Sequence, residues 1–539
     1  MNRRKFIRKS AIASFGIPVI ISACTGKTTP DTDLDLVDGI SNDFPLLEST
    51  IADLQRMFKE GKASVRSVTE LYLSRIEAVD QSGVGLNSVI ELNPDALKIA
   101  DMLDGEMKSG KLRGPLHGVP VLIKDNIDTA DRMMNTAGSL ALEGNYPERD
   151  AYIISQLRAA GAVILGKTNL SEWANFRSNQ SSSGWSSRGG QTKNPYVLDR
   201  NPCGSSSGSG ASVSANLCMV AIGTETNGSI ICPASINGVV GIKPTVGLWS
   251  RSGIIPISAT QDTAGPMART VQDAAILLGA LTGVDQADTA SNGLEEKIIK
   301  DYTVYLDRGG LKGRRIGIEK SYLKKNEKVD GLLSAAIEHL KGQGAEVIEI
   351  ELLDKLNGIG SDEYKVLLYE FKDGVNKYLS GARAKVHNLE DVIAFNRSHA
   401  DVAMPIFTQD ILEESQKLGD LNTAEYRDAL KRLLDTTRNA INQVMTEFKL
   451  DAISGPSYGP SWCTDHVNGD YSTGYGFSGP AAIAGYPHIT VPMGFVSGLP
   501  IGLSFFGQAF SEPKLISMAY AYEQVSLNRR PPQFERDIG

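Results

Sequence analysis

Buried strands alternate with helices in the first third of the chain, and this alternation limits the fold more than any other feature of the sequence. PLHGVPVLIKDNIDT (115–129) indicates a strand preceded by glycine and proline. Residues 151–160 indicate a helix that ends at Gly161, and residues 162–165 a buried strand. A helix that leads directly into a buried strand is typical of layered α/β proteins. Although the chain has 539 residues, one wide sheet can carry a single large core.

In the rest of the chain, apolar spacing and residue composition separate several segments. Apolar spacing over residues 49–79 predicts two helices separated by Gly61. Residues 180–210 are rich in Ser, Gly, Asn and Pro and predict a loop, followed by a helix of small residues over 211–220. We expect one domain over residues 46–535, with a core at 46–300 and 450–535 and a helical insertion at about 300–450.

The first 24 residues, MNRRKFIRKSAIASFGIPVIISAC, predict an export signal. They have a basic start and an apolar run too short to cross a membrane. Arg3 and Arg4 resemble a twin-arginine signal, and ISAC resembles a bacterial lipobox that would make Cys24 a lipid anchor. The alternative is cleavage near Ala23 and a soluble periplasmic protein. Residues 25–45 predict a flexible tether. From the export signal and the lipobox we expect the protein in the periplasm or outer cell envelope, anchored by a lipid.

Composition excludes some functions. The net charge of −8 gives no support to nucleic-acid binding, which calls for a basic surface. Beyond Cys24 the cysteines show neither C-x-x-C spacing nor paired histidines, so we expect small buried side chains rather than a metal site or a disulfide. These cysteines are Cys203, Cys218, Cys232 and Cys463.

Lys124 ends the apolar run of the strand predicted within 115–129. Because a buried ammonium is costly, such a lysine either reaches solvent or pairs with Asp125, or it is desolvated and neutral. A neutral lysine amine can accept a proton, and a Ser–Lys pair is a known variant of nucleophile and base.

A serine in GTETNGSIICP (223–233) suits that chemistry. Thr226, Asn227, Gly228 and Ser229 predict a tight turn whose backbone N–H groups converge on one point, as in an oxyanion hole. Gly228 would let a carbonyl group come close to the turn.

A second serine offers an alternative. GSSSG (204–208) matches the G-x-S-x-G elbow of α/β-hydrolases, with Ser206 as nucleophile and Asp465 or Asp470 with His466 or His488 as partners. That elbow needs a strand that leads directly into the serine, whereas LDRNPC (198–203) is turn-forming.

Taken together, these motifs resemble the amidase signature family. The resemblance covers roughly residues 50–300 and 450–525. It implies an α/β/α sandwich with a large mixed β-sheet surrounded by helices, and hydrolysis of linear amides without a metal or cofactor. The segments that carry it are PLHGVPVLIKDNIDT (115–129), GKTNLSEWA (166–174), GSSSGSGAS (204–212), GTETNGSI (223–230), GVVGIKPT (238–245) and YPHITVPMGFVSGLPIGLSFFG (486–507).

The resemblance assigns roles to matching positions. Lys124 is the base of the family's Ser–cisSer–Lys triad, Ser205 the bridging serine on a cis peptide bond, and Ser229 the nucleophile that forms the acyl-enzyme. The backbone amides of 226–229 form the oxyanion hole, and Ser206 supports the lysine or the turn.

Three departures from the family pattern narrow the branch. Glu225, Asn227 and Ile231 stand where many members have Asp, Gly and Arg. The missing Arg argues against the tRNA-dependent amidotransferases of the family, and the variant motif is most similar to peptide amidases, which remove C-terminal amides of peptides. A non-catalytic lipoprotein that binds peptides on the same scaffold is the alternative from another class. We expect a small-molecule or peptide amide as substrate, with no nucleic-acid partner and membrane contact only through a lipid at Cys24.

Overall fold

The computed structural model describes residues 44–538. The predicted export signal, Cys24 and nearly all of the predicted tether lie outside the described residues. Phe44, which the sequence assigns to the tether, already packs edge-on against Tyr72 of the first helices, with 5.3 Å between the ring centroids. Within residues 44–538, no helix is both long and apolar enough to span a bilayer.

Eleven strands form one sheet, in the order β1-β3-β2-β6-β8-β7-β12-β13-β11-β9-β10, and two more form a separate hairpin, β4-β5. The strands are β1 Val89–Leu92, β2 Pro120–Lys124, β3 Val163–Thr168, β4 Trp185–Ser186, β5 Gly190–Gln191, β6 Val220–Glu225, β7 Val240–Lys243, β8 Thr263–Ala268, β9 Arg315–Glu319, β10 Glu346–Ile350, β11 Ala452–Pro456, β12 His488–Val496 and β13 Leu499–Phe506.

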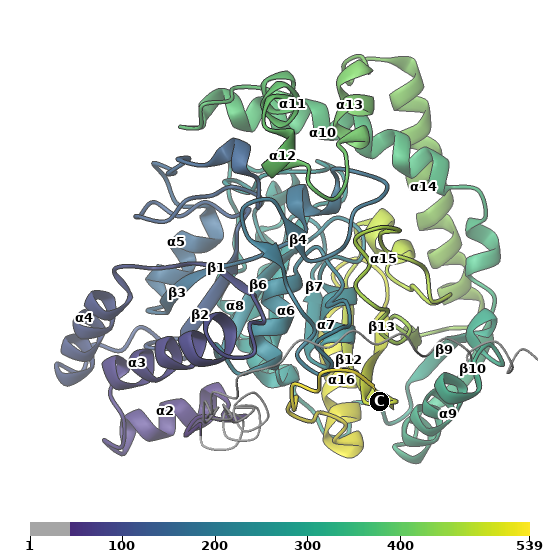
Figure 1. Ribbon diagram of the computed structural model, residues 1–539. Coiled ribbons are helices and arrows are strands. Elements are labelled where there is room, and N and C mark those ends of the chain that lie inside the picture. Colours follow the sequence, from purple (N-terminus) through teal and green to yellow (C-terminus); the bar gives the residue numbers. More distant parts are fainter. Residues whose placement is uncertain (1–43, 539) are drawn as a thin grey trace, which may run out of the picture.

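Helices surround this sheet (Figure 1). They are α2 Ile51–Lys59, α3 Val65–Arg75, α4 Ala96–Lys108, α5 Tyr152–Ala159, α6 Ser207–Ser214, α7 Ile231–Ile236, α8 Val271–Leu281, α9 Glu327–Gly342, α10 Gly360–Gly381, α11 Leu389–Ser398, α12 Ala400–Ala403, α13 Asp410–Lys417, α14 Ala424–Glu447, α15 Gly479–Ala484 and α16 Glu512–Ser526. The break predicted at Gly61 is confirmed, because α2 and α3 each begin with their own capping box, at Thr50 and Ser64.

The sheet is mixed, as expected. β2 runs parallel to β3 and β6, whereas β8, β7, β12 and β13 pair antiparallel with their neighbours. α6 and α7 contact each other and the central strands, and α8 and α16 form a second such pair. The sequence prediction of an α/β fold with a large mixed sheet is therefore confirmed.

The ends of β2 and β6 define the centre of the molecule. Ile123 pairs with Ile222 in parallel register, and every residue of both strands is buried. Parallel neighbours end at the same edge, which is where α/β sheets bind ligands. Lys124 therefore lies beside Thr224, immediately before the turn at 226–229.

The Gly/Ser-rich run forms a helix earlier than the sequence predicts. α6 begins at Ser207, inside the predicted loop, and ends at Ser214, before most of the predicted helix. All eight of its residues are buried. A Cβ on Gly208 would lie 2.2 Å from the carbonyl oxygen of Ser88, so only a chain of very small side chains fits here.

Residues 300–450, where the sequence predicts a helical insertion, contain α9 to α14. They also contain β9 and β10, which extend the sheet to its edge next to β11. α10 and α11 pack together, and α10 also packs against α13 and α14, forming the green group of helices at the upper part of Figure 1. This group brings α10 close to the end of β6.

Candidate active site

Lys124 is completely buried at the end of β2. Its Nζ donates to Ser205 Oγ at 2.7 Å, to Thr224 Oγ1 at 2.8 Å and to the Thr224 carbonyl at 3.2 Å. Asp125 is not its partner, since that carboxylate accepts from Thr136 and forms an ion pair with Arg188 at 3.3 Å. Of the two readings of this lysine, the structure therefore favours the desolvated amine.

Burial lowers the pKa of Lys124 to about 7. The nearby carboxylates of Asp262 and Glu225 oppose this shift without reversing it. Near neutral pH a large share of the protein therefore carries Lys124 as a neutral amine. A neutral amine keeps a lone pair, so the group that donates to Ser205 in one protonation state can accept a proton from it in the other.

Ser205 follows a cis peptide bond from Gly204, as the family resemblance implies. The next residue joins this segment to the turn, because the Ser206 amide donates to the Ser229 carbonyl at 3.2 Å. The Ser206 hydroxyl donates to the Thr224 carbonyl at 3.0 Å and accepts from the Thr224 amide at 3.2 Å. The structure thus brings together the segments of Lys124, Ser205 and Ser229.

The turn at 226–229 connects β6 to α7. Gly228 has a φ of +86°, and a Cβ there would lie 2.3 Å from Tyr458 Oη, so the position requires glycine. Glu225 Oε2 accepts from the amides of Ile230 and Ile231 at 2.7 and 2.9 Å. The carboxylate of Glu225 thereby fixes the first two backbone amides after the predicted nucleophile. Many family members have the shorter Asp at this position.

Asn227, another departure from the family pattern, is held from two sides. Its Nδ2 donates to Glu363 Oε1 of α10 at 2.7 Å, and its Oδ1 accepts from Ser478 Oγ at 2.9 Å. Gln261 also donates to Glu363, at 3.1 Å, and to the Thr226 carbonyl at 3.3 Å. α10 therefore fixes the predicted oxyanion turn through a carboxylate whose pKa burial raises.

Ser229 lines a cavity of about 400 Å³, here called the front cavity. Its other lining residues include Asn227 and Gly204 from the two loops and a set of aromatic side chains: Phe176, Tyr458, Trp462, Tyr471 and Tyr475. Ser229 is 8% exposed, so a ligand in this cavity can reach it. This exposure distinguishes it from Ser205 and Ser206, which are essentially inaccessible.

A disulfide joins Cys203 to Cys232, with 6.0 Å between their Cα atoms. The expectation of a free thiol was wrong for these two residues. Their spacing in the sequence gives no hint of the bond, because only the folded loops bring residue 203, next to the cis bond, against α7. Cys218 is free and buried as expected, whereas Cys463 is free but exposed.

The alternative nucleophile, Ser206, lacks the predicted surroundings. It precedes α6 without a strand leading into it, and both of its hydroxyl hydrogen bonds are to Thr224. His488 contacts Ser504 at 2.6 Å, and His466 is exposed and contacts Gln191 at 2.9 Å. Asp470 accepts from Ser183 and Trp462. This geometry does not assemble a Ser-His-Asp triad on Ser206.

A family model described as Amidase matches residues 67–516. This chain belongs to the amidase family. It is 44% identical over 507 residues to a probable amidase of Arabidopsis thaliana, covering 92% of this chain and 93% of that protein. It is also 35% identical over 504 residues to a component of the glutamyl-tRNA(Gln) amidotransferase of Halorhodospira halophila, covering 89% of this chain and 97% of that protein.

Among solved structures, the native peptide amidase from Stenotrophomonas maltophilia is 50% identical to this chain, with a TM-score of 0.87. The likeness covers 91% of this chain and 99% of that one. The amidase signature resemblance is confirmed, and this amidase is an enzyme that hydrolyses amides.

Sequence reasoning missed several groups that contact the site. Thr224 lies within the quoted GTETNGSI motif and Asn126 two residues after Lys124, so their proximity was readable from the motifs. Glu363 carried no such signal, because it lies 136 positions from Asn227 in an ordinary charged helix.

The contact of Glu363 with the turn gives a testable consequence. Glu363→Ala removes the acceptor of both Asn227 and Gln261, so the turn amides lose their fixed direction. We expect kcat to fall about tenfold with KM changed less than about twofold, because oxyanion donors act mainly in the transition state. Steady-state kinetics on an amide substrate measures this.

Asp362→Ala is the matched control, since it removes a neighbouring carboxylate of α10 that pairs with Arg432 at the surface. It should leave both constants unchanged, and Glu363→Gln, which retains an acceptor oxygen, should recover part of the lost kcat. A rise in KM alone for Glu363→Ala would show instead that this residue acts on substrate binding.

Proposed function

We propose that this amidase removes the C-terminal amide of peptides through an acyl-enzyme on Ser229. One observation carries the proposal: Ser229 borders the front cavity, and its loop contacts the segment whose Ser205 bonds directly to a buried lysine with a pKa lowered to about 7. Activating a serine requires a base, and Lys124 supplies one without histidine.

The reaction follows from this arrangement. The Ser229 hydroxyl attacks the amide carbon while its proton passes through Ser205 to Lys124. The amides of the turn at 226–229 stabilise the negative oxygen, and the C–N bond breaks as the proton returns to the leaving nitrogen. Water then attacks the acyl-enzyme, releasing the carboxylic acid and restoring Ser229.

The front cavity supports an uncharged peptide as the acyl part. None of the described residues that line it is a lysine or an arginine. Its carboxylate, Asp470, already accepts from Ser183 and from Trp462 at 3.0 Å. A free C-terminal carboxylate would therefore find no cation there, whereas an amidated end needs none. A similar structure, 50% identical, is that of a peptide amidase in complex with the competitive inhibitor chymostatin.

Ammonia release tests the proposal. The substrates are an acetylated dipeptide amide and a simple aliphatic amide, each with wild type, Ser229→Ala and Ser206→Ala. We expect the dipeptide amide to be the better substrate and Ser229→Ala to lower kcat by about 10⁴-fold or more. Ser206→Ala removes two hydrogen bonds to the backbone of Thr224 but leaves the nucleophile, so it should retain measurable turnover.

Other outcomes would point elsewhere. Full activity of Ser229→Ala together with an inactive Ser206→Ala would favour the α/β-hydrolase alternative. A wild-type protein that binds the peptide amide without releasing ammonia would favour a peptide-binding lipoprotein. Preference for the aliphatic amide would keep the mechanism and contradict the peptide specificity.

We also propose that the protein is exported and anchored by a lipid at Cys24. The motifs around Arg3, Arg4 and Cys24 support this, and so does the Cys203–Cys232 disulfide, because disulfides persist mainly in oxidising compartments.

Fractionation of a bacterium that expresses the full chain tests this location. Wild type should appear in the membrane fraction and Cys24→Ala in the soluble periplasmic fraction, because the anchor is lost. Replacing Arg3 and Arg4 together by Lys should leave the protein in the cytoplasm. Wild-type protein in the cytoplasm would contradict export, and soluble periplasmic wild type would support cleavage near Ala23.

A further inference from the structure

A second cavity, here called the rear cavity, reaches the site from the other side of the turn. Its volume is about 390 Å³, and its lining includes Asn126, Thr224 and the loop at 254–259. It shares three lining residues with the front cavity: Ala174, Thr226 and Ile257. The two cavities therefore meet at the predicted oxyanion turn.

The rear cavity lies on the lysine side of this boundary. Thr224 Oγ1 accepts from Lys124 at 2.8 Å and from Asn126 Nδ2 at 3.1 Å. Both Thr224 and Asn126 line the rear cavity and not the front one. Because the lysine relay must deliver a proton to the leaving nitrogen, the cavity beside the lysine is the one that suits the amine half of a substrate.

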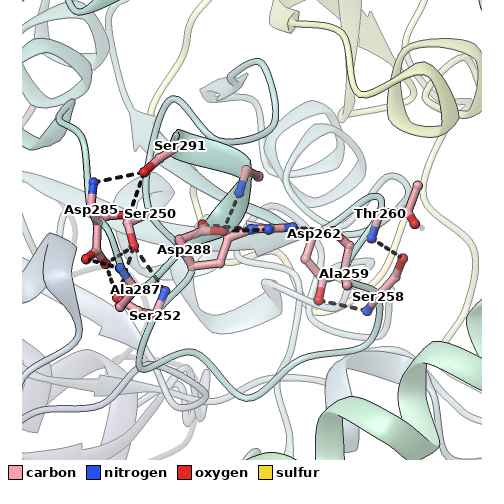
Figure 2. Close-up of polar contacts among 12 residues, drawn as sticks. Ser250, Ser252, Ser258, Ala259, Thr260, Asp262, Asp285, Ala287, Asp288 and Ser291 are labelled. Carbon is pink, nitrogen blue, oxygen red and sulfur yellow. Dashed lines mark hydrogen bonds and ion pairs between the residues drawn. The ribbon is translucent and has the colours of Figure 1, made fainter. Parts of the chain in front are cut away.

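The walls of the rear cavity are fixed by hydrogen bonds within the protein. Figure 2 shows Ser250 and Ser252 directed at Asp285, with the Ser250 hydroxyl 2.6 Å from that carboxylate. Arg251, between them, forms an ion pair with Asp288 at 2.6 Å. These bonds tie the loop that precedes residue 254 to the loop at 285–291.

The charged groups of the lining are already paired. Arg251 and Asp288 neutralise each other, and Lys377 pairs with Asp373 at 2.6 Å. Asp262 accepts from Thr226 Oγ1 at 2.5 Å and from two backbone amides at 2.8 Å. What remains for a ligand is chiefly the apolar surface of Ile254, Ile255, Pro256 and Ile257. The cavity therefore suits an uncharged apolar group.

One acceptor at the inner end has no partner. Asn126 is 2% exposed, and within residues 44–538 no group donates to its Oδ1. Its Nδ2 donates to Thr224 Oγ1 at 3.1 Å, and the oxygen itself has almost no accessible surface. Asn126 therefore forms a fixed inner wall of the rear cavity through its bond to Thr224.

We propose that the rear cavity is a leaving-group subsite that binds the uncharged alkyl or aryl substituent of a secondary amide. This inference rests on the proposed function and widens its substrates. The volume of the rear cavity is far larger than ammonia needs, since a cavity of about 150 Å³ already holds a benzene ring. Ser229 Oγ bonds to the carbonyl carbon, the C–N bond breaks, and the Ser229 proton reaches nitrogen to give a neutral amine.

The test uses one acetylated dipeptide as three amides: the primary amide, the N-propyl amide and the anilide. Ala287 and Ala259 are exposed residues of the rear cavity that do not line the front one, so tryptophan at either position narrows only the rear cavity. We expect wild type to hydrolyse all three. Ala287→Trp and Ala259→Trp should each lower kcat/KM for the anilide about tenfold or more and change it less than about twofold for the primary amide.

Ala394→Trp, at an exposed position of α11 outside both cavities, is the control and should change neither substrate. Equal losses on the primary amide and the anilide would overturn the subsite. So would a wild type that hydrolyses the primary amide but neither secondary amide. Failure on all three amides would instead contradict the proposed function itself.

Discussion

The burial of the Lys124 amine is the interaction on which the rest of the site depends. A fully buried ammonium is costly, and the protein meets this cost by lowering the pKa of Lys124 to about 7 and by giving Nζ three oxygen partners. Each partner has a second task. Ser205 precedes Ser206, whose amide bonds to the Ser229 carbonyl. Thr224 lies near the end of β6, just before the turn that contains Ser229. The same bonds that make the lysine tolerable therefore also set the geometry of the proposed relay.

Two reinforcements hold this arrangement in place from outside the sheet. The Cys203–Cys232 disulfide links the loop of the cis bond to α7, and Glu363 of α10 holds the side chain of Asn227. The long helical segment thus contributes directly to the shape of the turn. With cavities on both sides of Thr226, the turn lies where the two halves of a bound amide would meet.

Much of this was readable from the sequence, and the remainder has physical reasons. A lysine at the end of an apolar strand is unusual and marked Lys124 as a candidate, although Lys243 ends the buried strand β7 in the same way. The start of α6 was missed because Ser and Gly favour loops locally, and only burial against the backbone of Ser88 makes small residues necessary there. The disulfide and the contact of Glu363 depend on which loops meet, and neither spacing nor periodicity carries that information.

Direct titration of Lys124 tests the central claim. Protein labelled with ¹³C at the lysine ε-carbons is followed by NMR from about pH 5 to pH 10, and Lys124→Met identifies its signal. Burial disfavours the charged form, so the Lys124 amine should lose its proton near pH 7, far below exposed lysines at about 10.4. A midpoint above about 10 would leave the lysine charged at neutral pH, and Lys124 could not then accept the proton of Ser229.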